Sequence, residues 1–162
     1  MAQDEGWGLA RISKLALIVG VLAGGYVTCV TSARKALIAG NEASAIGSLR
    51  SIGTAQTTYS ATECTGRYAP TLTSLGAKGL LSSDLTVADT IERGGYRIAM
   101  SVPAQPTASG QSPACADSVT AFTATAVPLD PGTSGVRYFI TDGSNEVRQA
   151  TDESFSDAAP VR

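Results

Sequence analysis

An uncharged run from Leu15 to Ala33, LALIVGVLAGGYVTCVTSA, constrains this chain more than any other feature. Lys14 precedes it, and Arg34 and Lys35 follow it. As a helix rising about 1.5 Å per residue, such a run spans roughly the 30 Å hydrocarbon core of a bilayer. The alternative is a core helix of a water-soluble protein, but the sequence has no second apolar segment of similar length to pack against it. We therefore expect a membrane helix whose apolar surface comes from Leu15, Leu17, Ile18, Val19, Val21, Leu22, Val27 and Val30.

Charge is divided unevenly between the two parts of the chain. The total is −2, but the first 35 residues sum to +2 and the remainder sums to −4. A protein that binds nucleic acid needs a basic face for the phosphates, so the acidic main part argues against such a partner. The length of 162 residues suits one domain in addition to the apolar segment.

The apolar run could be a cleaved secretory signal, a lipoprotein signal or an uncleaved signal anchor. A cleaved secretory signal needs a shorter apolar region and a small-residue cleavage site, and residues 31–33 match that site poorly. Cys29 lacks the small residue that precedes a lipoprotein cysteine. We favour an uncleaved signal anchor with the N-terminus in the cytoplasm, and we expect residues 1–9 to be a short leader or tail.

Two of the three cysteines lie in the polar part of the chain. Cys64 and Cys115 are 51 residues apart, whereas Cys29 lies inside the apolar run. In an oxidising compartment they would form a single disulfide, and a loop of this length corresponds to roughly 4 kcal/mol of stabilisation. Two unpaired thiols are the alternative.

The helical pattern continues beyond the apolar run. Apolar residues recur every three or four positions between Ala45 and Tyr59, and no proline occurs before Pro70. We predict one near-continuous helix over residues 10–60, with residues 15–33 as its transmembrane part. The opposite face of its second half is expected to hold Asn41, Glu42, Ser44, Ser48, Arg50 and Ser51. The predicted packing residues toward a sheet are Ile46, Leu49, Ile52 and Tyr59.

The distal half carries strand and turn signals. Residues 61–93 read as an irregular connection, residues 94–151 as an antiparallel sheet, and residues 152–162 as a polar tail. About four strands are predicted, at 96–102, 119–128, 136–141 and 146–150. The fold class is therefore α+β, with the amphipathic half of the long helix packed on a small antiparallel sheet.

The residues in this order resemble a known family. Asn41 to Ile52, NEASAIGSLRSI, followed by Thr54-Ala55-Gln56 and Thr58-Tyr59, is similar to the post-membrane helix of type IV pilin-like proteins and of type II secretion pseudopilins, the major pseudopilin included. The likeness continues through residues 68–72, 94–97 and 137–142. The resemblance implies a subunit that assembles with copies of itself or other pilin-like subunits, and in which residues 15–33 lie in the membrane or in the core of a filament. It also implies a bacterial inner membrane location with a periplasmic domain, or an extracellular filament.

The N-terminus departs from that family. The family has a basic leader, a glycine and a start that is cut and N-methylated, whereas this chain has Asp4 and Glu5 and only Gly8-Leu9 as a possible processing site. Lys14 or Ser13 stands where the family has a glutamate. The alternative function is therefore an uncleaved, membrane-anchored periplasmic binding or sensing module that does not polymerise.

The sequence carries little that indicates catalysis. It has no histidine, which excludes Ser-His-Asp and Cys-His catalysis and imidazole metal sites. We expect no enzyme, no catalytic residue, no small-molecule substrate and no cofactor, with calcium as the one cofactor left open. Four acidic residues and one asparagine near the C-terminus raise this possibility, and we interpret them as a hairpin turn and a solvated tail: Asp142, Asn145, Glu146, Asp152 and Glu153.

Overall fold

The computed structural model describes residues 6–103 and 115–161, with side chains from Thr31 onward. The chain divides into two compact units, Met1–Leu37 and Ile38–Arg162. Helix α1, Gly6–Thr62, supplies the described part of the first unit and the first element of the second. The α+β class and the long helix are as predicted.

The predicted membrane segment falls largely outside the residues whose side chains are described. Where side chains are described, no helix is both long enough and apolar enough to cross a bilayer. Nothing is described of the side chains of residues 15–30, so the membrane or filament-core role of this run stays a prediction.

Helix α1 ends just before the disulfide cysteine. The amides of Glu63 and Cys64 still donate to the carbonyl of Tyr59, and the amide of Gly66 donates to the carbonyl of Ser60. Gly66 has a φ of 75°, a conformation that glycine adopts without strain at the end of a helix.

The connection after α1 is more ordered than the sequence indicated. Helix α2, Leu72–Ala77, is capped by Thr71, whose hydroxyl accepts a 3.0 Å hydrogen bond from the Ser74 amide. A 3₁₀ turn, η1, follows at Ser83–Leu85. The leucines of this segment act as apolar plugs: Leu72, Leu75, Leu81 and Leu85 are buried and Leu80 is half-buried.

The sheet has six antiparallel strands in the order β1-β2-β3-β4-β5-β6. They are β1 Thr90–Arg93, β2 Tyr96–Ser101, β3 Thr123–Pro128, β4 Tyr138–Asp142, β5 Arg148–Ala150 and β6 Ala159–Pro160. The prediction of about four strands was therefore wrong in number, although β2, β3 and β5 lie in predicted regions and β4 overlaps the fourth.

Both additional strands lie where irregular structure was expected. Strand β1 falls in the predicted connection and forms a hairpin with β2 through Gly94 and Gly95, whose φ angles of 55° and 72° suit a tight hairpin turn. Strand β6 falls in the predicted polar tail and pairs with β5. The predicted second strand also begins too early, because Val119 forms only an isolated bridge with Tyr68.

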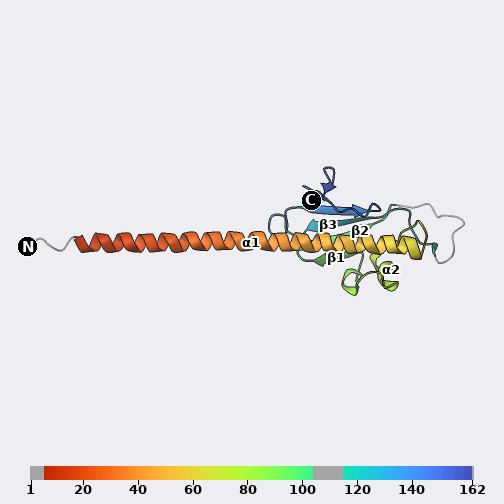
Figure 1. The fold of residues 1–162 in the computed structure, drawn as a ribbon, viewed down its shortest axis with the longest axis horizontal. Helices are drawn as coiled ribbons and strands as arrows, with labels where there is room; N and C mark the ends of the chain where they lie inside the picture. The colour runs from red at the N-terminus through yellow and green to blue at the C-terminus, as the bar shows by residue number, and fades with distance from the viewer. Residues whose placement is uncertain (1–5, 104–114, 162) are drawn as a thin grey trace, which may run out of the picture. The chain divides into compact units, whose positions relative to one another are not determined.

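One face of the sheet forms the core together with α1. In β2, Tyr96, Ile98 and Met100 are buried while Arg97 and Ser101 are exposed, which is the predicted alternation. The later part of α1 runs along the sheet (Figure 1). Its buried residues belong to the same apolar cluster as those of β2, β3 and β4. This packing fixes the second half of α1 against the sheet.

Candidate functional site

The buried stripe of α1 is the attachment between helix and sheet. Leu49 and Ile52 are fully buried and Tyr59 is 5% exposed, as the helical spacing predicted, whereas Ile46 is only half-buried at the edge of the cluster. Ala45, Ala55 and Gln56 complete the buried stripe. Burying this many apolar side chains on one helix face makes the second half of α1 part of the folded unit.

Glu42 corrects the sequence interpretation of the outer face. It was expected in solvent, but it is 4% exposed. Its carboxylate accepts hydrogen bonds from the backbone amides of Val136 and Arg137 at 3.1 and 3.2 Å, and from the Arg137 side chain at 2.9 and 2.6 Å. Ser48 is likewise buried, at 5% exposure. A charged side chain is found this deep only where it is paired, and here the pairing ties α1 to the segment that enters β4.

The charge of Glu42 is stabilised by this pairing. Burial raises the pKa of the carboxyl group, but the hydrogen bonds from Arg137 and Val136 and the guanidinium charge together hold the pKa below its usual 4.5. Because the pKa is lower in the folded chain than in the unfolded one, the associated stability is complete above about pH 4.5 and is lost as the pH falls through the folded-state value.

We expect Glu42→Gln to lower the free energy of unfolding by about 1–2 kcal/mol at pH 6, since a neutral amide cannot replace the charge-assisted bonds. At pH 3 the difference from the parent should shrink. Urea unfolding of the full chain in detergent, at both pH values, measures this. Glu92→Gln is the matched control, because Glu92 is exposed and meets Arg97 only at 3.5 Å. A Glu42→Gln deficit that is equally large at pH 3 would contradict the assignment.

A second buried polar contact lies farther along α1. The Gln56 side chain, fully buried, accepts a 2.8 Å hydrogen bond from the Ala69 amide and donates one of 3.0 Å to the Ala69 carbonyl. Its amide nitrogen also lies 3.2 Å from the sulfur of Met100. Gln56 thereby satisfies the backbone of the irregular connection, which has no strand partner at Ala69.

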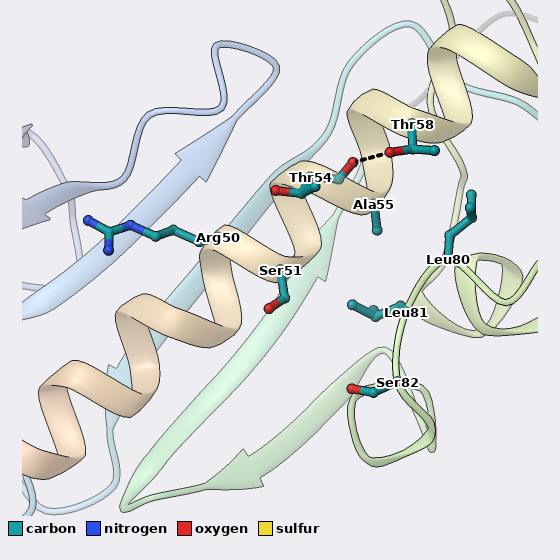
Figure 2. A pocket seen from close by; sticks show the side chains of 8 residues that line it. All are labelled: Arg50, Ser51, Thr54, Ala55, Thr58, Leu80, Leu81 and Ser82. Atoms are coloured by element: carbon teal, nitrogen blue, oxygen red, sulfur yellow. Dashed lines mark hydrogen bonds between the residues drawn. The ribbon is translucent and has the colours of Figure 1, made fainter.

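A groove lies between α1 and the connection (Figure 2). Its volume is about 430 Å³. Ala55 and Leu81 form a buried apolar floor, while Ser51 and Thr58 donate their hydroxyl hydrogens to the carbonyls of Gly47 and Thr54. Arg50 extends away from the leucines in Figure 2. The lining residues are Arg50, Ser51, Thr54, Ala55, Thr58, Leu80, Leu81 and Ser82.

Cys64 and Cys115 form a disulfide in the structure, with their Cα atoms 5.7 Å apart. The bond joins the end of α1 to the segment that leads to Val119, which forms a backbone bridge with Tyr68. Cys64 is buried and Cys115 is half-buried. The disulfide therefore closes the loop that contains α2, β1 and β2.

The acidic residues and Asn145 near the C-terminus lie in or beside turns. Asp142 accepts hydrogen bonds from the Ser144 amide at 2.9 Å and from Arg148 at 2.6 Å, and these partners hold its pKa below the usual range. Asp152 accepts from the Ser154 amide, and Asn145, Glu146 and Glu153 are exposed. Among the side chains described, those of residues 31–103 and 115–161, no group of three acidic, cysteine or histidine side chains is placed to hold a metal ion.

The eight apolar residues from Leu15 to Val30, and the possible processing site at Gly8 and Leu9, lie outside the residues whose side chains are described. Their assignments remain predictions.

Comparison with known proteins gives no relative. No protein-family model matches the sequence, and neither the curated proteins nor the solved structures contain a match.

Proposed function

We propose that this chain is a structural, pilin-like subunit that assembles through the apolar first half of α1 into a type IV pilus-like or secretion pseudopilus filament. One observation carries the proposal. Helix α1 has 57 residues, but within residues 31–62 the first buried side chain is that of Glu42. The preceding sequence holds the uncharged run from Leu15 to Ala33. An apolar helix surface of that length needs lipid or other helices around it.

The outer face of α1 adds support from two glycines. At Gly40 and Gly47 a methyl group would meet no atom within 4 Å. Each glycine in a helix interior costs up to about 1 kcal/mol relative to alanine, and the packing of the described residues gives no reason for that cost. A close approach by a helix of another subunit would give one.

The disulfide supports an exported location. Such bonds persist in oxidising compartments, including the bacterial periplasm and the cell exterior. The proposed partners are accordingly copies of this chain or other pilin-like subunits, together with the inner membrane. The proposal involves no catalysis, nucleic acid, small-molecule substrate or cofactor.

N-terminal mass spectrometry of the native protein, with electron microscopy of material sheared from cells, tests the proposal. A chain beginning at Leu9 with an added methyl group would show processing, and filaments containing the chain would show assembly. In a Cys29→Ser background, Ile18→Cys should crosslink between copies in native membranes, whereas Val87→Cys, in an exposed loop, should not. A chain that stays monomeric in native membranes and forms no filament contradicts it.

The second candidate is an uncleaved, anchored binding or sensing module that does not polymerise. The groove between α1 and the connection favours this candidate. Its volume of about 430 Å³, its apolar floor and the hydroxyl groups of Ser51, Thr54, Thr58 and Ser82 that line it would suit a bound segment or molecule. This candidate predicts an intact Met1 and a monomer in detergent.

A further inference from the structure

The groove between α1 and the connection combines an apolar floor with a positively charged rim. Ala55 and Leu81 form the floor, and the half-buried Leu80 lies beside them. At the rim lies Arg50, whose side chain is exposed and extends away from the leucines (Figure 2). An occupant that fits both parts needs an apolar group for the floor and a negative charge for the rim.

Arg50 is the basic side chain that the second unit leaves without a partner. Five other basic side chains of this unit form ion pairs, and Arg67 donates hydrogen bonds to Ser118. Across residues 38–103 and 115–161, Arg50 alone has neither an ion pair nor a hydrogen bond from its side chain. The paired residues are Lys78, Arg93, Arg97, Arg137 and Arg148.

The loop that joins β5 to β6 has the complementary chemistry. Residues 151–158, TDESFSDA, contain three carboxylates and no basic residue. Within the described part of the chain, none of these carboxylates pairs with a basic side chain. Phe155 follows Glu153 by two positions and is only half-buried. The loop therefore presents an aromatic ring and uncompensated negative charge close together.

The conformation of this loop is fixed by its own hydrogen bonds. The Thr151 hydroxyl donates a 2.6 Å hydrogen bond to Asp157, and the Ser154 amide donates one of 2.8 Å to Asp152. Phe155 has a φ of 54°, a left-handed conformation that is rare for an aromatic residue and that glycine adopts without strain. A loop that is ordered in advance loses little conformational entropy when it binds.

The groove and the loop lie toward opposite edges of the sheet. A second hollow shares Ser51 and Ser82 with the groove and is also lined by Arg93 of β1, which places the groove on the β1 side. The loop follows β5 and leads into β6, at the other end of the strand order. With neighbouring strands about 4.8 Å apart, these two edges are separated by roughly 24 Å. A contact between the groove and the loop therefore joins two copies of the chain.

We propose that the loop over residues 151–158 of one copy docks in the groove of a second copy. Phe155 lies on the apolar floor, and Asp152 or Glu153 pairs with Arg50. The contact joins two different surfaces, so each copy keeps a groove or a loop for the next one and the assembly continues in one direction unless it closes into a ring. The inference rests on the proposed assembly of the chain and names a contact between the folded units within it.

Crosslinking between two forms of the full chain tests this contact. Both forms carry Cys29→Ser and different tags and are produced together; one has Ser82→Cys in the groove, and the other has Ser156→Cys beside Phe155. Cys64 and Cys115 are bonded to each other, so a short bismaleimide reacts with the introduced thiols. We expect it to join the two forms in native membranes. Val87→Cys in place of Ser82→Cys is the matched control, because Val87 is 80% exposed and does not line the groove, and it should give little product.

Charge reversal separates specific docking from mere proximity. Arg50→Glu in the groove form should lower the crosslinked fraction by about tenfold or more, because like charges then face each other. Asp152→Lys with Glu153→Lys in the loop form should restore it. Arg97→Glu, on an exposed residue of β2, is the matched control and should leave the yield unchanged. Phe155→Gly should also lower the yield, although glycine keeps the left-handed backbone of the loop without strain.

The outcomes separate this contact from the proposed function. Crosslinking between copies at Ile18→Cys, without product from Ser82→Cys and Ser156→Cys, overturns the docking and leaves assembly through α1 intact. Product at neither place overturns both. Equal product with Val87→Cys overturns the assignment to the groove, and product between two copies that carry only Ser82→Cys overturns the head-to-tail arrangement. A loss with Arg50→Glu that the lysine variants fail to restore overturns the charge pairing.

Discussion

Replacing Val21 with lysine should remove most of the chain from membranes and prevent its assembly. Val21 lies near the middle of the uncharged run, where a lysine costs about 2.5–3.5 kcal/mol on insertion scales. The run also contains Gly20, Gly24 and Gly25, so its insertion is only moderately favourable and one charge suffices to reverse it. A cost of about 3 kcal/mol corresponds to a change of roughly a hundredfold in the inserted-to-excluded ratio.

Carbonate extraction of membranes, followed by quantification of the pellet, measures this effect. Val87→Lys is the matched control, because it adds the same charge to a side chain that is already 80% exposed. Its pelleted fraction should equal that of the parent. If Val21→Lys is retained in the pellet as fully as the parent, the run neither spans a bilayer nor supplies a filament core.

The sequence predicted the helix–sheet packing because each of the two elements has a clear periodicity that defines its apolar face. Leu49, Ile52 and Tyr59 recur at helical spacing, and Tyr96, Ile98 and Met100 alternate at strand spacing. Each pattern defines one apolar face, and two such faces in one small unit have only each other to cover them. The structure places all six side chains in one cluster.

The missed strands show where the sequence carries less information. Gly94-Gly95 between two short β-prone segments is itself a hairpin signal, so β1 was predictable. Strand β6 was not, because it has two residues, one a proline, and depends on pairing with β5. A strand this short forms because it pairs with its neighbour, and its own sequence has no alternating pattern that would predict it.

Glu42 was missed for a different reason. A glutamate on a helix belongs by default to the solvated face, and its burial depends on Arg137, 95 residues later in the chain. One sequence signal was available: Glu42 is the only charged residue between Lys35 and Arg50, and Arg137 is the only basic residue between Arg97 and Arg148. A lone acidic residue in a neutral stretch and a lone basic residue in an acidic stretch are a reason to consider pairing across a fold.

Removing the disulfide should have the largest effect on the stability of the folded unit. We expect the double variant Cys64→Ser/Cys115→Ser to lose roughly 4 kcal/mol of unfolding free energy, because a cross-link between residues 51 apart restricts the unfolded chain by about that amount. The loss is a large fraction of the 5–15 kcal/mol typical of whole domains. Urea unfolding of the full chain in detergent measures it.

The position of the bond predicts which region opens first without it. Cys115 precedes Val119, whose amide and carbonyl exchange hydrogen bonds of 2.9 and 2.8 Å with Tyr68. With the bond removed, the bridge loses its covalent link to the end of α1 and keeps weaker contacts such as the hydrogen bonds from Arg67 to Ser118, so the amides of Tyr68 and Val119 should exchange hydrogen faster than those of β3. Cys29→Ser is the control, because Cys29 lies in the apolar run and should leave both measurements unchanged. The parent treated with a reductant should match the double variant. A double variant within about 1 kcal/mol of the parent would mean that the bridge between Tyr68 and Val119 forms as readily in the open chain, and that the closed loop contributes little.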